Sequence, residues 1–232
     1  MQKPAKIAVR VAVPKDADKI VDFVVRYIGT TSPINKALNF TEADSRETYE
    51  QKIRISLGDG LSFVAVDGDK EDVVGCMVAS NYFRDSSKNH SFDVPKTPQA
   101  KIHHQMVEPF KSLFWELCPA NVHAVSRGYC FLIHPDLRRQ KIGSEIVVRR
   151  MERTFLKSKG LQGYTGVVSS FANLQNTGKH GAIPMAELEY KKLFEKHGIP
   201  FRGSLPDGST KCVMMFNPLE ENRDFSPKIH KL

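Results

Sequence analysis

The densest group of residues able to do chemistry is a short basic stretch that follows an apolar strand. Residues 129–133 (YCFLI) are apolar, and residues 138–144 (RRQKIGS) open a helical pattern after a Pro turn. The first amide N–H groups of a helix point outward without partners and carry the positive end of the macrodipole. With the side chains of Arg138, Arg139 and Lys141, these amides predict an anion site for a phosphorylated ligand.

The spacing of this stretch excludes two common phosphate-binding motifs. Neither G-x-G-x-x-G nor G-x-x-x-x-G-K-[ST] is present, and the nearest pattern is R/Q-x-x-G-x-G/A, with Lys141 in place of its first Gly. Gly143 lacks a side chain, which predicts that a ligand approaches the backbone closely there. The strand, the turn and the helix together resemble motif A of the GNAT superfamily of acetyl-CoA-dependent N-acetyltransferases.

The resemblance implies acetyl-CoA as cosubstrate, with the pyrophosphate on the helix start and the pantetheine arm along a strand that bulges and splays away from its neighbour. The implied coenzyme-binding residues are Phe131, Leu132, Ile133, Arg138, Arg139, Gln140, Lys141, Ile142, Gly143, Ser144 and Asn173. A Lys at the first Gly position requires a turn that an ordinary residue tolerates.

Three residues are candidates for catalysis. The backbone N–H of Ile133, at the expected bulge, is the candidate oxyanion donor. Tyr129, two residues before Phe131 and therefore on the same strand face, is the candidate to hold a water chain, although a half-buried core Tyr is an equally good interpretation. Ser170 is the candidate to orient the thiol end, and it is also an ordinary helix cap. His134 is interpreted as a turn histidine.

The resemblance extends from Ile7 to about Pro218 and is strongest to the invertebrate arylalkylamine N-acetyltransferase-like subfamily. Ser32 stands where relatives carry a Glu linked to the amine's proton, and Thr177 stands where many carry an acidic Tyr. Residues 183–198 fit a helix by composition and a strand by alternation. The resemblance favours a strand over 183–190, and the other reading leaves Phe194 at the Tyr position.

The elements predicted around these residues alternate between strands and helices. Apolar periodicity predicts strands at 7–13, 61–67, 73–83, 129–133, 163–170 and 209–217, and helices from 17, 41, 101 to 117, 141 to 158 and 171. The order predicts a mixed α/β (α+β) sheet, mostly antiparallel with one splayed parallel pair and helices on both faces. Residues 1–218 are expected to form one domain, and residues 219–232 a mobile tail.

Composition limits the functional classes. The chain has 232 residues, a net charge of +8 and four separated cysteines, so neither a zinc site nor a disulfide framework is predicted. The cations are spread along the sequence, which disfavours nucleic acid, and no apolar run is long enough for a membrane span. We expect a cytoplasmic protein, monomer or homodimer, without a resident metal.

Three functions remain open from the sequence. The leading hypothesis is transfer of acetyl from acetyl-CoA to a small primary amine, an arylalkylamine, by direct attack in a ternary complex. A protein lysine acetyltransferase and a non-catalytic CoA-binding module are the alternatives, the latter because of Ser32 and Thr177. The amine, the proton acceptor and the oligomeric state are not determined at this level.

Overall fold

Strands and helices alternate along most of the chain in the computed structural model, which describes residues 7–68, 71–219, 225 and 227–232. The strands are β1 (Ile7–Val11), β2 (Phe63–Asp67), β3 (Asp72–Phe83), β4 (Ala124–Ile133), β5 (Gly163–Val168), β6 (Ile183–Glu189), β7 (Lys211–Pro218) and β8 (His230–Lys231). The helices are α1 (Ala17–Thr31), α2 (Pro33–Ala37), α3 (Glu42–Ser56), α4 (Pro98–Val107), α5 (Pro109–Leu117), α6 (Ile142–Arg150), α7 (Arg153–Ser158), α8 (Phe171–Lys179) and α9 (Tyr190–Lys196).

The strands form one sheet in the order β1-β2-β3-β4-β5-β7-β6-β8. Neighbours are antiparallel except for the pairs β4–β5 and β6–β8, which are parallel. The predicted mixed sheet is therefore confirmed, with a second parallel pair at its edge. That second pair corrects the expectation for the C-terminus, because His230 and Lys231 lie beside β6 as β8 instead of in a tail. Residues 220–224 and 226 lie outside the described residues.

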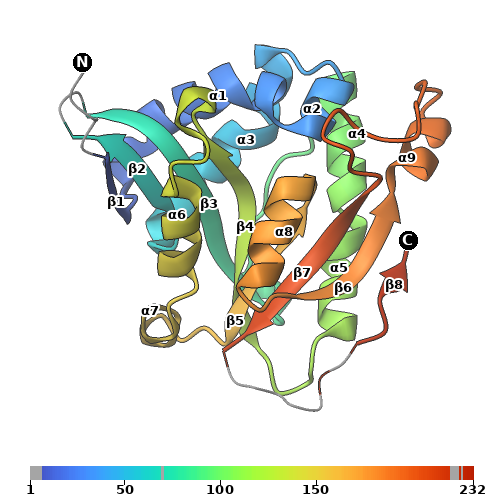
Figure 1. Cartoon of the computed structure of the whole chain (residues 1–232). Coiled ribbons are helices and arrows are strands. Elements are labelled where there is room, and N and C mark those ends of the chain that lie inside the picture. Colours follow the sequence, from blue (N-terminus) through green and yellow to red (C-terminus); the bar gives the residue numbers. More distant parts are fainter. Residues whose placement is uncertain (1–6, 69–70, 220–224, 226) are drawn as a thin grey trace.

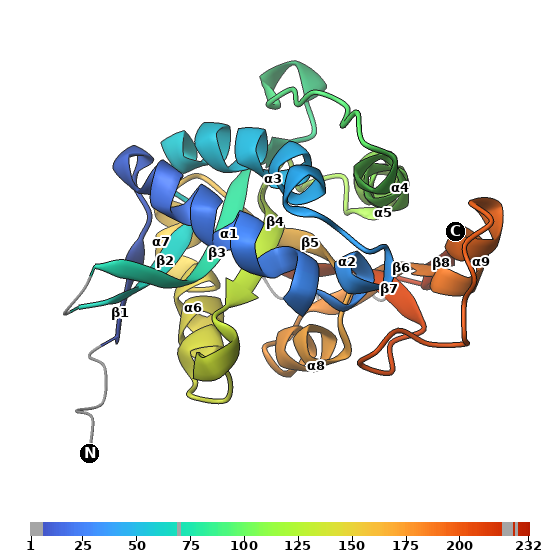
Figure 2. The ribbon, with the colours of Figure 1, turned by 90° about the horizontal axis from the view of Figure 1, so that it is seen from above.

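Helices cover both faces of the sheet (Figure 2). Helices α1 to α5 lie on one face, and α6 and α8 lie on the other. On the first face α1 and α3 pack on β2, β3 and β4, and α2, α4 and α5 pack toward β6 and β7. On the second face α6 packs on β1, β2 and β3. The boundary between β4 and β5 lies in the middle of the sheet.

The start of α3 follows from its first residues. Thr41 Oγ1 accepts from the Asp44 backbone N–H at 3.2 Å, and Asp44 Oδ2 accepts from the Thr41 backbone N–H at 2.8 Å. This reciprocal capping box satisfies two amides that a helix N-terminus otherwise leaves free. The predicted helix from 41 is therefore present with Thr41 as its cap, and it ends before Gly60, whose φ is +65°.

Two predicted helices are each divided in the structure. The helix expected over 101–117 is α4 followed by α5, because Pro109 has no N–H and its ring is sterically incompatible with a continuing helix. The helix expected over 141–158 is α6 followed by α7. Glu152 leaves the helical conformation with a ψ of 119°, and this turn lets Phe155 pack edge-on against Phe63, with 5.3 Å between the ring centroids.

The ambiguous segment contains both a strand and a helix. Ile183–Glu189 is β6, paired with β7, and α9 begins at Tyr190. The strand favoured by the resemblance is confirmed. The helix favoured by the composition follows it as α9. Phe194 of α9 is buried against Phe201, at 5.1 Å between ring centroids.

Two classes of feature are absent from the described part of the chain. None of its helices is both long and apolar enough to cross a membrane. It also contains no group of three or more His, Cys, Asp or Glu side chains placed to hold a metal ion. All four cysteines are buried free thiols.

Candidate active site

The turn before α6 exposes a run of unpaired backbone amides. Glu145 N–H donates to the Lys141 carbonyl at 2.9 Å and is the first paired amide of the helix. Among the described residues, no acceptor contacts the six amides from Arg139 to Ser144. Arg138, Arg139 and Lys141 are exposed around them. Unpaired helix-start amides bordered by cations are an arrangement that suits an anion, so the anion site stays a prediction.

The backbone of this turn is unusual for its residue types. Arg139 and Lys141 both have a φ of +65°, in the left-handed region that favours glycine. The sequence led us to expect a conformation that an ordinary residue tolerates, and this expectation is wrong. The two non-glycine residues at these positions therefore bear a conformational cost.

Replacing Lys141 by Gly separates the shape of the turn from its charge. Lys141→Gly removes the left-handed strain, at some cost in chain entropy, and should raise the free energy of unfolding by about 0.5–1 kcal/mol. The same variant loses one cation and should bind CoA more weakly. Urea unfolding and CoA titration of the same preparation measure both effects. A lower unfolding free energy for Lys141→Gly would contradict the strain. Gly160→Lys is the converse control, because Gly160 already has a φ of +71°.

Gly143 lines the cavity and also lies against β4. A Cβ atom at this position would lie 3.3 Å from Phe131 Cζ and 3.6 Å from Ile133 Cγ1. The missing side chain therefore allows α6 to pack closely on β4, and the prediction that a ligand approaches the backbone here stays open. This close packing fixes the unpaired amides at the end of β4.

Strand β4 contains a bulge at Tyr129. Gly128 pairs with Ala79 and Cys130 pairs with Val78, so that Tyr129 is an extra residue on β4. The parallel pairing of β4 with β5 also ends at Gly128. The predicted bulge and splay are present, but the bulge lies four residues before Ile133, where we expected it. Cross-strand pairing with β3, which the sequence of β4 alone does not specify, sets this position.

Beyond the bulge, β4 has free backbone groups that face β5. His134 N–H donates to the Val74 carbonyl of β3 at 2.8 Å. Because backbone groups alternate sides along an extended strand, the N–H groups of Ile133 and Phe131 point away from β3, into the opening. Both amides are therefore free to bind a ligand in the opening. Leu132 lies between them with its side chain buried on the α1 side.

A cavity of about 610 Å³ runs through this opening and reaches both faces of the sheet. On the second face it is bounded by α6 and α8, and on the first by α1, α3, α4 and α5. Twelve of the thirteen predicted site residues line it: Tyr129, Phe131, Leu132, Ile133, Arg138, Arg139, Lys141, Ile142, Gly143, Ser144, Ser170 and Asn173. Gln140, the exception, is exposed, and its side chain points back to the Asp136 carbonyl at 3.5 Å.

Tyr129 lies on the opposite face of β4 from Phe131. Phe131 packs with the α6 residues Ile142 and Ile146, whereas Tyr129 packs with the α1 and α3 cluster. The prediction that they share a face is wrong, because the extra residue at the bulge interrupts the alternation of side chains. The Tyr129 hydroxyl lies 2.8 Å from Ser80 Oγ, and burial raises the pKa of Tyr129.

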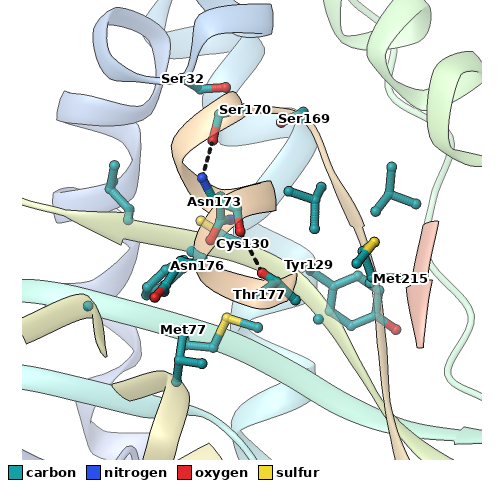
Figure 3. Close-up of a pocket in the computed structure, with 18 of the residues that line it drawn as sticks. Ser32, Met77, Tyr129, Cys130, Ser169, Ser170, Asn173, Asn176, Thr177 and Met215 are labelled. Carbon is teal, nitrogen blue, oxygen red and sulfur yellow. Dashed lines mark hydrogen bonds between the residues drawn. The ribbon is translucent and has the colours of Figure 1, made fainter. Parts of the chain in front are cut away.

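Helix α8 forms one wall of the cavity (Figure 3). Ser170 Oγ accepts from the Asn173 N–H at 3.4 Å, so that Ser170 caps the helix and also faces the cavity. Thr177 is buried, and its hydroxyl donates to the Asn173 carbonyl at 2.7 Å. The Thr177 hydroxyl is therefore engaged within the helix.

Ser32 lines the cavity, whereas His134 lies outside it. Ser32 connects α1 to α2 and lines the cavity near Ser170 (Figure 3). His134 Nδ1 accepts from the Asp136 N–H at 3.3 Å, and His134 Nε2 lies 3.1 Å from the Tyr27 hydroxyl. His134 is a turn histidine, as predicted, and it does not line the cavity.

The first-face half of the cavity contains polar residues that the sequence analysis did not select. Tyr49 and Lys52 of α3, His103 of α4, and Arg127 of β4 line it together with apolar side chains. The aromatic residues Phe110 and Phe114 of α5 also line this half. The sequence contained one signal for Lys52, because this residue interrupts the buried face that Tyr49, Ile53 and Ser56 form on α3.

His103 is buried as a neutral imidazole. Its Nε2 lies 3.4 Å from the Tyr49 hydroxyl, and its Nδ1 has no partner among the described residues. Burial, together with the nearby Lys52 and His104, lowers the pKa of His103 from 6.5 to about 3. Charging this group inside the fold is therefore unfavourable.

This burial predicts a specific sensitivity to acid. The unfolded chain binds a proton at His103 below pH 6.5 and the folded chain does not until about pH 3, so stability falls as the pH falls between these values. His103→Phe should remove about 1.4 kcal/mol per pH unit of this loss. Urea unfolding at pH 7 and pH 4.5 measures it, with the exposed His123→Phe as control. Equal acid sensitivity of wild type and His103→Phe would contradict the assignment.

The second-face half contains one buried arginine without an acidic partner. Arg150, at the end of α6, is 7% exposed, and its guanidinium lies 4.0 Å from the centroid of the Tyr164 ring. One of its amino groups contacts Met77 Sδ at 3.4 Å, and its Nε has no partner among the described residues. The site thus combines a helix N-terminus, free strand amides and several cations around one cavity.

Comparison of this geometry with solved structures defines the fold as that of the GNAT N-acetyltransferases. No protein-family model and no curated protein sequence matches the chain. An arylalkylamine N-acetyltransferase 7, described as putative, from the yellow fever mosquito is similar with a TM-score of 0.74 and 14% identity, over 92% of this chain and 88% of that one. A polyamine N-acetyltransferase from Drosophila melanogaster is similar with a TM-score of 0.67 and 12% identity, over 92% and 100%.

A third similar structure is described as a condensation domain. The C-terminal condensation domain of Ebony, solved with β-alanyl-dopamine, has a TM-score of 0.70 and 12% identity, over 93% of this chain and all of that one. At these identities the likeness establishes the fold. The resemblance to the invertebrate arylalkylamine N-acetyltransferases noted in the sequence thus extends to the whole architecture.

Proposed function

We propose that this protein is an acetyl-CoA-dependent N-acetyltransferase that acts on a small primary amine. The observation that carries the proposal is the single cavity that joins the unpaired amides of 139–144 to the opening between β4 and β5. The N-acetyltransferases of similar fold support the reaction class.

We call the second-face half of the cavity, which contains these amides, the donor half. Its positive charge supports a coenzyme A ester as ligand. The amides of 139–144 and the side chains of Arg138, Arg139 and Lys141 would hold the pyrophosphate. The free N–H groups of Phe131 and Ile133 would bind the amides of the pantetheine arm as a neighbouring strand does. Ser170 and Asn173, on the α8 wall, would contact the thiol end of the arm.

Acetyl-CoA supplies the acetyl group as a thioester, and the protein would position the acceptor amine against it. The amine must first lose its proton, because a primary ammonium has a pKa near 10. A C–N bond then forms, the C–S bond breaks, and the departing sulfur takes a proton. Phe131 N–H is the first cavity-facing amide after the bulge, and we assign it, in place of Ile133, as the donor to the developing oxyanion.

Tyr129 lines the cavity and would donate a proton to the departing sulfur or hold a water next to it. Because burial raises its pKa, its hydroxyl stays protonated at neutral pH and acts as a donor, not as a base. The Ser80 hydroxyl, 2.8 Å away, would orient it. The base is then water within the cavity.

The acceptor half of the cavity supports a small acceptor over a peptide. Helices α1, α3, α4 and α5 cover this half, and Phe92 packs edge-on against Tyr129 at 5.4 Å. The apolar side chains of Met106, Phe110 and Phe114 fit the carbon skeleton of an aryl or alkyl amine.

Purified protein incubated with acetyl-CoA and a panel of primary amines tests the proposal. Release of free CoA thiol together with an acetylated amine identified by mass spectrometry is the expected result. A histone-tail peptide in the same panel tests the peptide alternative. CoA binding without any acetylated product would contradict the proposed activity and leave a coenzyme-binding module.

A further inference from the structure

The acceptor half of the cavity contains two cations on opposite walls. Lys52 extends from α3, and Arg127 extends from β4 beside the bulge. Arg127 lies between two tyrosine rings, at 4.9 Å from the Tyr82 centroid and 5.8 Å from the Tyr129 centroid. Both cations therefore border the place where the amine would meet the thioester.

Neither cation has an acidic partner. Among the described residues, no hydrogen bond or ion pair reaches the Lys52 ammonium or the Arg127 guanidinium. Burial, followed by repulsion from Arg127, lowers the pKa of Lys52 to about 8, so that Lys52 is still mostly charged at pH 7. Leaving the buried Lys52 ammonium without an anionic partner is costly.

The nearby carboxylates are engaged elsewhere. Asp59 accepts from His90 Nε2 at 3.0 Å and from the Asn81 N–H at 2.7 Å. Glu108 contacts Lys111 and His104 at the molecular surface. Asp207, the one acid that lines the cavity in the described chain, accepts from the Phe171 N–H at the α8 end. The acceptor half therefore repels an ammonium and attracts an anion.

We propose that Lys52 and Arg127 form an anion subsite that binds the carboxylate of the acceptor, so that the substrate class is an amino acid with an apolar side chain. This inference rests on the proposed function and names its acceptor. A carboxylate between the two walls satisfies both cations, and the apolar side chain contacts Met106 and Phe110. The subsite lies next to the bulge, so the carboxylate and the amine are close together in the acceptor.

Three acceptors with the same aromatic body test the subsite. Phenylalanine, its methyl ester and phenethylamine differ in the carboxylate that we assign to Lys52 and Arg127. Loss of one charge-assisted hydrogen bond costs about 1.5–3 kcal/mol, so phenylalanine should have a kcat/KM about 10- to 100-fold above both others. Equal or greater kcat/KM for phenethylamine would overturn the inference.

Matched variants locate the effect. Lys52→Met and Arg127→Met should each reduce kcat/KM for phenylalanine at least tenfold more than they reduce kcat/KM for phenethylamine. Lys52→Glu should reverse the preference. Lys101→Met and Arg26→Met remove exposed cations outside the cavity and should change neither value. Loss of activity toward both acceptors in the Met variants, with CoA binding intact, would assign these residues a general positional role and overturn the subsite.

A binding measurement distinguishes this inference from the proposed function. Calorimetric titration of phenylalanine into the CoA-bound protein should give heat in wild type and none in Lys52→Met. That result without turnover of any amine would contradict the acetyltransferase and keep the anion subsite. Turnover of simple amines without phenylalanine binding would support the acetyltransferase and contradict the anion subsite.

Discussion

Replacing Arg138 and Lys141 together by Glu should raise the KM for acetyl-CoA about 100-fold or more, with a much smaller change in kcat. Both side chains border the six unpaired amides before α6. Charge-assisted hydrogen bonds contribute about 1.5–3 kcal/mol each, and the reversed charges also repel the phosphates. Because these contacts are remote from the thioester, they bind the ground state and the transition state equally.

Initial rates at varied acetyl-CoA, together with calorimetric titration of CoA, measure this effect. Arg26→Glu/Arg153→Glu carries the same change in net charge at exposed positions outside the cavity and should behave as wild type. The effect should decrease with added salt, because the side chains are exposed. Unchanged kinetics in the Arg138→Glu/Lys141→Glu variant would remove the phosphate assignment.

Tyr129→Phe should lower kcat about 10- to 100-fold and leave the KM for acetyl-CoA nearly unchanged. The variant removes only the hydroxyl that we place beside the departing sulfur, and proton transfer by a positioned side chain contributes on the order of 10²-fold or more. Since burial raises the pKa of Tyr129, the wild-type rate should not decline on the basic side until well above neutral pH.

Pre-steady-state rates and pH profiles of both proteins measure this role. Tyr27→Phe is the matched control, because the Tyr27 hydroxyl contacts His134 and lies outside the cavity. Ser80→Ala should give a smaller loss of kcat, since it removes only the group that orients Tyr129. Full kcat in Tyr129→Phe would contradict this role and would mean that the departing sulfur takes its proton from water.

The turn before α6 shows how far a local pattern predicts a site. The apolar run, the Pro turn and the basic helix start lie within 16 residues, and their amides are unpaired for reasons internal to the helix. Local pattern also specified the capping box at Thr41 and the stop at Gly60. These features depend on neighbours in the chain, so they could be predicted before the structure.

The position of the bulge and the convergence of Lys52, His103 and Arg127 depend on residues distant in sequence. The pairing of Val78 and Ala79 with β4 decides that Tyr129 is the extra residue, and this moves its side chain to the face opposite Phe131. Lys52 and Arg127 are 75 positions apart in the sequence and come together only because α3 packs over β4. The sequence by itself therefore determined the donor site, whose contacts are local, whereas the tertiary structure decided the acceptor site, whose charges are brought together by packing.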